Sequence, residues 1–160
     1  MPFWRWFFLL GLAWGVGLLA VWPAWAQVPP QLPGRWELRQ ISFVANQTVP
    51  PDIFERMNNP EVAELNREIA GGAAHLVVEF RPEGTYHFTI VRAGQPDYTE
   101  RGTYSVADKV LLGQSPGMAS GSSFDHQQVL ALSRRRLVLQ FLVGEELPGI
   151  TEELEYRRVP

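Results

Sequence analysis

The feature that most constrains the fold of this chain is the alternation of apolar and polar residues in short segments separated by turn residues. A period of two is typical of β-strands that bury one face. The clearest case is a predicted hairpin, in which the alternating segments 76–80 and 86–90 flank Pro82-Glu83-Gly84. Proline followed by glycine at the left-handed position specifies a tight turn with a glycine bulge, which would pair Arg81 with Thr85.

Eight segments are predicted to be strands, namely 35–44, 76–80, 86–90, 98–106, 110–112, 125–133, 137–141 and 150–159. Most of the connections are short, which favours antiparallel neighbours in up-and-down order. Closure into a barrel removes the exposed edges that a flat sheet of this size would leave. We therefore predict an all-β domain, an eight-stranded antiparallel up-and-down barrel. A β-sandwich is the alternative that this pattern leaves open.

The first predicted strand changes its apolar face along its length. Trp36 and Leu38 share one face, whereas Ile41 and Phe43 share the other. An extra residue in a strand restores a common face and bends the strand. A β-bulge is therefore expected near Gln40.

A short helical insertion is predicted between the first two strands, over residues 60–70. Asn59 is a suitable N-cap, and Pro60 suits the first helical position. One helical turn is expected before it, over residues 52–57. The apolar stripe of the longer helix is narrow and must lie on another element; it consists of Val62, Leu65 and Ile69. We interpret residues 51–72 as a lid over the barrel.

Residues 1–26 have the pattern of an export signal peptide. Arg5 precedes an apolar run, and Ala24-Trp25-Ala26 is a small-x-small cleavage site. This pattern predicts that the mature chain begins at Gln27 and is exported to the periplasm or outside the cell. An uncleaved membrane anchor is the alternative, since the run is nearly long enough to span a bilayer. After cleavage no stable membrane insertion is expected.

The mature chain divides into an N-terminal extension, residues 27–33, and one folded domain, residues 34–160. Its composition excludes several classes of function. A formal net charge of −3 is too small to indicate a nucleic-acid partner, and the absence of cysteine excludes disulfides and thiolate chemistry. The loop 113–123 has neither the spacing that positions a nucleophilic serine nor that of a phosphate-binding loop. Neither an enzyme nor a cofactor is predicted.

The predicted hairpin places one acidic residue and one histidine on neighbouring strands. Glu79 and His87 would face each other outside the barrel if Phe80 and Tyr86 face each other inside. A metal would need a third ligand, which the sequence does not supply, so a solvated cross-strand pair and no metal are expected. Glu152 belongs to a strand rim that is expected to be solvated.

Five motifs follow one another in an order that resembles the small lipocalin-like domains of exported bacterial proteins. They are Gly34-x-Trp36, Phe80-x-Pro82-Glu83-Gly84-Thr85-Tyr86, Gly102-Thr103-Tyr104-Ser105-Val106, Leu137-Val138-Leu139 and Glu155-Tyr156-Arg157-Arg158. The resemblance implies a lipocalin-like barrel for nearly all of the mature chain. One departure is that lipocalins proper carry a helix after the last strand, whereas this sequence ends at that strand.

The closed end of the predicted barrel is assigned to Gly34 and Trp36. The first and last strands of an up-and-down barrel are antiparallel neighbours, so the start of one meets the end of the other. We therefore expect Arg158 or Arg157 to cover the indole of Trp36.

Two functions remain open for the barrel interior. The first is a binding protein for a small, largely apolar ligand held in the lumen. The second is a non-enzymatic interaction or inhibitor module that has a packed barrel and acts through its loops. The oligomeric state is not indicated by the sequence. The lumen candidates are Tyr86, Phe88, Ile90, Tyr98, Tyr104, Leu139 and Phe141.

Overall fold

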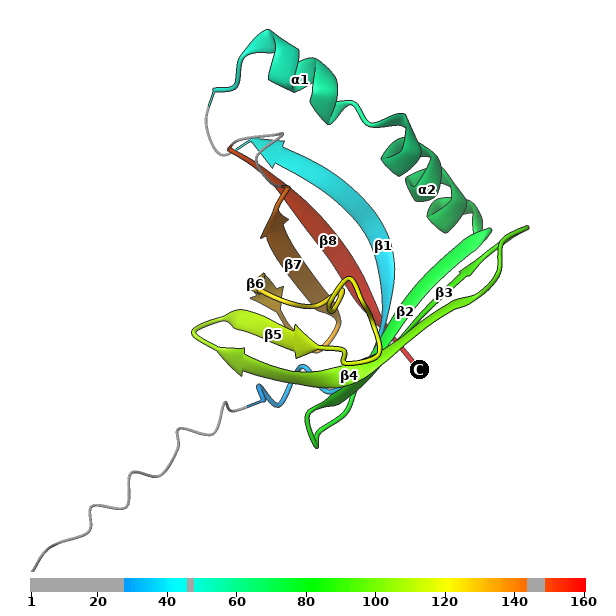
Figure 1. The fold of residues 1–160 in the computed structure, drawn as a ribbon, viewed down its shortest axis with the longest axis vertical. Coiled ribbons are helices and arrows are strands. Elements are labelled where there is room, and N and C mark those ends of the chain that lie inside the picture. The colour runs from blue at the N-terminus through cyan, green and yellow to red at the C-terminus, as the bar shows by residue number, and fades with distance from the viewer. Residues whose placement is uncertain (1–27, 46–47, 144–148) are drawn as a thin grey trace, which may run out of the picture.

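The eight predicted strands form a closed antiparallel barrel in sequence order in the computed structural model, which describes residues 28–45, 48–143 and 149–160. The predicted up-and-down barrel is thereby confirmed, and the β-sandwich alternative is wrong. The predicted signal peptide lies outside the described residues. The strands, drawn in Figure 1, are β1 (Gly34–Ala45), β2 (Ala74–Phe80), β3 (Thr85–Arg92), β4 (Tyr98–Ala107), β5 (Val110–Gln114), β6 (Gln127–Leu132), β7 (Arg136–Leu142) and β8 (Ile150–Val159).

The hairpin of β2 and β3 has the predicted register. The amide of Arg81 donates to the carbonyl of Thr85 over 2.8 Å. Phe80 lies opposite Tyr86, and Glu79 lies opposite His87. Within the described ranges, no three His, Cys, Asp or Glu side chains are placed to hold a metal ion.

The bulge expected near Gln40 is confirmed. β1 pairs with β8 along its length, and the register shifts between Leu38 and Gln40. Because of this shift, Leu38 and Ile41 are both buried in the core. The bend also carries β1 away from β2, with which it pairs only from Gly34 to Glu37.

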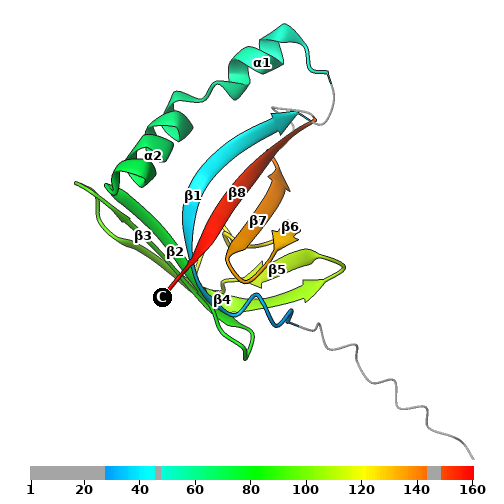
Figure 2. The same cartoon turned by 180° about the vertical axis from the view of Figure 1, so that it is seen from behind.

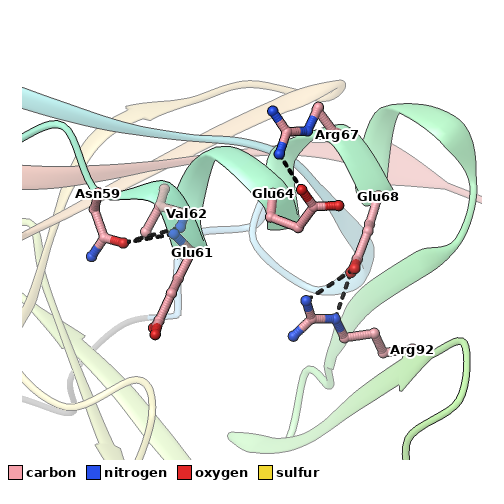
Figure 3. Close-up of polar contacts among 7 residues, drawn as sticks. All are labelled: Asn59, Glu61, Val62, Glu64, Arg67, Glu68 and Arg92. Atoms are coloured by element: carbon pink, nitrogen blue, oxygen red, sulfur yellow. Dashed lines mark hydrogen bonds and ion pairs between the residues drawn. The ribbon is translucent and has the colours of Figure 1, made fainter.

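Two helices connect β1 to β2, α1 (Pro51–Met57) and α2 (Pro60–Gly71). The side chain of Asn59 caps α2, since its Oδ1 accepts hydrogen bonds from the amides of Glu61 and Val62 (Figure 3). Both views of the fold show α2 beside β1, at the end of the barrel where β1 and β2 separate (Figures 1 and 2). Ile69, on the apolar stripe of α2, is buried in the core.

Polar contacts attach α2 to the strands on both sides of it. Asn66 Nδ2 donates to the carbonyl of Ile41 over 2.8 Å, and the amide of Ile41 donates to Asn66 Oδ1 over 2.9 Å. β2 does not pair with β1 at Ile41. The side-chain amide of Asn66 therefore takes the place of a neighbouring strand and pairs with the backbone N–H and C=O of Ile41. On the other side, Arg92 of β3 donates two hydrogen bonds to Glu68, of 2.5 and 3.0 Å (Figure 3).

Replacement of Asn66 by alanine is expected to lower the free energy of unfolding by about 1–2 kcal/mol, because it leaves a partly buried amide and carbonyl of β1 without partners. Urea denaturation measures the loss, and hydrogen exchange should accelerate at the amide of Ile41. Asn58→Ala, at an exposed position in the same connection, is the control and should be near neutral. Equal stability of the two variants would show that Asn66 does not attach α2 to the barrel.

Candidate ligand-binding cavity in the barrel

The barrel holds a cavity of about 630 Å³ between β1, β7, β8 and the connection from β5 to β6. Its apolar wall comes mainly from inward-facing strand residues, as the alternation of burial along the strands requires. Its polar wall comes from the β5–β6 connection, the first residue of β6 and β8. The apolar wall includes Leu38, Ile41, Leu76, Phe88, Phe141 and Leu154, and the polar wall includes Ser122, Ser123, Asp125, His126, Gln127, Glu152 and Tyr156.

The connection from β5 to β6, residues 115–126, is here called the inner loop; it is the yellow segment between these strands in Figure 1. Its Phe124 is 1% exposed. The ring packs edge-on against three aromatic rings, with centroid distances of 5.4 Å to Phe80, 5.2 Å to Tyr86 and 5.2 Å to Phe88. The inner loop therefore fills the part of the lumen next to β2, β3 and β4, and the cavity occupies the remainder.

Gly113 permits this close approach of the inner loop. A Cβ at this position would lie 2.6 Å from the Ser122 hydroxyl oxygen and 2.9 Å from the backbone of Phe124. Backbone atoms cannot move aside as the end of a flexible side chain can. Any larger residue at position 113 would therefore displace the inner loop from β5.

The buried carboxylate of Glu100 holds the inner loop in place. Glu100 is 1% exposed, yet it accepts hydrogen bonds from the Ser123 hydroxyl at 2.6 Å, the Ser123 amide at 3.0 Å, the Tyr98 hydroxyl at 3.1 Å and the Tyr86 hydroxyl. Burial raises the pKa of this carboxyl, but the hydrogen bonds outweigh burial and hold the pKa below its usual range. Burial and the Glu100 carboxylate together raise the pKa of Tyr86 to about 12.

Of the seven predicted lumen residues, Phe88 and Phe141 line the cavity. The others pack the core instead: Tyr86, Tyr104 and Leu139 are buried, and Ile90 and Tyr98 are half-buried against them. The hydroxyl of Tyr104 donates to the carbonyl of Arg81 over 2.7 Å. The barrel interior therefore has two parts. Packed side chains, including most of the predicted lumen residues, fill one part, and the cavity occupies the other.

Glu152 and Tyr156 of β8 line the cavity, and sequence reasoning missed both. Glu152 lies between Phe43 and Phe141 in the ladder and faces inward, so its assignment to a solvated rim was wrong. Burial raises the pKa of its carboxyl. Tyr156 lies on the same face and is 3% exposed. The signal was present in the sequence, since positions 152, 154 and 156 alternate with polar positions on the other face.

The expected lid, residues 51–72, contributes no described residue to the cavity wall. The contacts of Asn66 and Glu68 also attach α2 firmly to β1 and β3. The connecting segment that lines the cavity is instead the inner loop. The expectation of a lid is corrected accordingly: α2 closes the gap between β1 and β2 in the barrel wall.

The opposite end of the barrel is closed by Trp36, which is fully buried and donates from its indole nitrogen to the carbonyl of Leu32 over 2.8 Å. The guanidinium carbon of Arg158 lies 4.3 Å from the ring centroid of Trp36. Of the two expected arginines, Arg157 pairs with Glu155 at 2.9 Å and takes no part in this contact.

Gly34 makes room for the guanidinium of Arg158. Its φ is 138°, and a Cβ there would lie 1.9 Å from Nη1 of Arg158. This φ favours glycine, and a larger residue at position 34 would also have to displace the guanidinium of Arg158, which lies next to it because the barrel is closed.

No protein-family model matches the chain, and the search of curated proteins gave no relative. Among solved structures, a lipocalin-like protein from Bacteroides uniformis is similar, with a TM-score of 0.49 and 14% sequence identity over 81% of this chain and 99% of that protein. This level of similarity gives no information on ligand or function. The fold assignment therefore rests on the closed order of the eight strands. Within the described ranges, none of the helices has the length and apolar character needed to cross a bilayer. The described chain is an eight-stranded antiparallel barrel with a short helical insertion between its first two strands, which is a lipocalin-like fold.

Proposed function

We propose that this protein is an exported, non-enzymatic binding protein that holds a small, largely apolar molecule in the barrel cavity. The observation that carries the proposal is the cavity of about 630 Å³ with its wall of inward-facing apolar side chains. Its volume falls within the range of about 300–1,000 Å³ that is common for small-molecule sites. The alternative, an interaction module with a packed barrel, requires a filled lumen, and the open half of this lumen favours the binding protein.

The physical basis of binding would be the removal of apolar surface from water. Leu38, Ile41 and Leu154 form a continuous part of the wall, because Ile41 lies opposite Leu154 in the β1–β8 ladder. Apolar contact contributes about 25 cal/mol for each Å² removed from water. The wall is part of a barrel held at its closed end by Trp36, so the site is largely formed before the ligand enters.

The export part of the proposal rests on residues 1–26. Cleavage after Ala26 would release the binding domain into the periplasm or the surrounding medium. N-terminal sequencing of the protein recovered from the medium or periplasm of its own host should begin at Gln27. Recovery of the full-length chain in the membrane fraction would refute cleavage and leave the binding site itself untouched.

Leu154→Trp is expected to lower the affinity for an aliphatic probe such as decanol by about tenfold or more, because the larger side chain fills the cavity. Calorimetric titration of delipidated protein measures the effect, and native mass spectrometry of protein from its own host identifies what the cavity carries. Leu130→Trp makes the same change at a position that is 43% exposed and outside the cavity wall. It should bind the probe as the wild type does.

Equal loss of binding in the two tryptophan variants would contradict the assignment of the site. Failure of decanol and of fatty-acid, isoprenoid and amine probes to bind the delipidated wild-type protein would refute the carrier function as a whole. Circular dichroism of both variants separates a loss of binding from a loss of fold.

A further inference from the structure

We infer that the ligand of this cavity carries an amine or similar cationic hydrogen-bond donor, which is bound by the carboxylate of Glu152 with the hydroxyl of Tyr156 as a second polar partner. This inference rests on the proposed function and adds the chemical class of the ligand. A fatty acid is disfavoured by the same reasoning, because its head group is itself an anion.

Glu152 differs from the neighbouring acidic residues of β8 in having no polar partner among the described residues. Glu153 accepts a hydrogen bond from Gln140 at 3.2 Å, and Glu155 forms ion pairs with Arg136 at 2.8 Å and Arg157 at 2.9 Å. Glu152 instead lies between two phenylalanines on the cavity wall. A carboxylate beside apolar groups loses hydration without compensation, and a donor in the cavity would restore it.

Tyr156 is another group on the wall that lacks a partner, as is the buried side-chain oxygen of Gln127. The other three tyrosine hydroxyls of the chain all form hydrogen bonds, with Glu100 or with the carbonyl of Arg81. Tyr156 is 97% buried and lines the cavity, and its hydroxyl has no hydrogen-bond partner in the described part of the chain. Besides burial, the negative charge of Glu152 raises the pKa of Tyr156, which places both groups within one electrostatic environment.

The charge of the cavity wall selects between ligand head groups. The other titratable side chains on the wall are Asp125 and His126, and the described wall contains no lysine or arginine. Asp125 pairs with His126 at 2.9 Å, whereas Glu152 has no such neighbour among the residues that the structure describes, so a ligand carboxylate near β8 would meet the unpaired carboxylate of Glu152. An ammonium group would form a charge-assisted hydrogen bond with Glu152, and such bonds are about twice as strong as neutral ones.

Three probes with the same aliphatic chain test the inference, namely decylamine, decanol and decanoic acid, each titrated calorimetrically at neutral pH below its micelle concentration. The wild-type protein should bind decylamine about tenfold or more tightly than decanoic acid, with decanol between them. Glu152→Gln should lower the affinity for decylamine by about tenfold and change that for decanol little. Tyr156→Phe should weaken both decylamine and decanol by a few fold.

Glu153→Gln is the matched control, since it neutralises the neighbouring carboxylate on the outer face of the same strand. It should leave all three affinities unchanged. Retention of decanol binding by Glu152→Gln shows that this variant is folded and that its cavity is intact.

Each other outcome overturns the inference in a recognisable way. Equal affinity for decylamine and decanoic acid, or an unchanged decylamine affinity in Glu152→Gln, refutes the amine preference while decanol binding still supports the carrier function. If Leu154→Trp still binds decylamine with wild-type affinity, the amine binds to acidic groups outside the cavity, and this outcome also refutes the inference. Absence of binding by all three probes refutes the inference, and failure of the isoprenoid probes as well refutes the carrier function.

Discussion

Glu100→Ala is expected to lower the free energy of unfolding by about 3–5 kcal/mol, because the carboxylate is the common acceptor for four buried or partly buried donors. Its removal leaves the hydroxyls of Tyr86 and Tyr98 and the amide of Ser123 without that acceptor. The variant should also release the inner loop, since two of the four bonds come from Ser123. Urea denaturation measures the stability, and hydrogen exchange at Ser123 measures the release.

Glu79→Ala is the control for this substitution. Glu79 is a glutamate on the outer face of β2, with a side chain that is 45% exposed. Its replacement should cost less than about 0.5 kcal/mol, as is usual for an exposed ion pair. A Glu100→Ala variant that is as stable as Glu79→Ala would show that water can replace the carboxylate and that the inner loop is held by Phe124 alone.

The dependence of stability on pH provides an independent measure of Glu100. Its pKa is lower in the folded chain than the ordinary value of 4.5, so its contribution is fully present above that value and is lost as the pH falls through the folded pKa. Glu152 affects stability in the opposite direction. Burial raises its pKa, so its charged form disfavours folding, and protonation at low pH removes this unfavourable contribution. Glu100→Gln should therefore reduce the loss of stability below about pH 4.5, and an acid-unfolding curve parallel to that of the wild type would contradict this.

Trp36→Ala is expected to lower the free energy of unfolding by about 3–5 kcal/mol, because it removes a fully buried indole from the closed end of the barrel. It also removes the donor for the carbonyl of Leu32 and the ring beneath Arg158. Trp36 is the only tryptophan after residue 26. In a wild-type chain that begins at Gln27, its fluorescence therefore reports on this site alone, and an emission maximum typical of exposed indole would contradict its burial.

Arg158 covers Trp36 at the closed end of the barrel, and Arg158→Ala should lower the free energy of unfolding by about 2–3 kcal/mol. The guanidinium donates to the carbonyls of Pro33 at 2.9 Å and Arg134 at 2.7 Å, and to that of Gln31, in addition to its contact with the indole. Hydrogen bonds from a charged group and cation–π contacts each contribute about 0.5–3 kcal/mol. Arg157→Ala, which removes only a surface ion pair, should cost less than about 0.5 kcal/mol.

A double-mutant cycle of Trp36→Ala and Arg158→Ala isolates the contact between the two side chains. The coupling energy should be about 0.5–2 kcal/mol, because the arginine loses its stacking partner but keeps its carbonyl acceptors when the indole is removed. Exact additivity of the two single substitutions would show that the contact itself stabilises nothing.

The sequence by itself determined the features that depend on neighbouring residues. The turn at Pro82-Glu83-Gly84 sets the register of β2 and β3, because proline and glycine restrict the backbone to one turn geometry. Alternation set which face of each strand is apolar, and the change of face in β1 identified the bulge near Gln40. The sequence also indicated that Trp36 closes one end of the barrel, because antiparallel order alone places the start of β1 beside the end of β8.

Only the tertiary structure decided how the lumen is divided between core and cavity. Phe124 comes from a glycine- and serine-rich connection, and its burial depends on space left by Phe80, Tyr86 and Phe88 from other strands. Glu100 is stabilised inside the barrel by Ser123, which is 23 residues away in sequence. A buried carboxylate is acceptable only with partners, and partners that distant are brought together by folding rather than by local pattern.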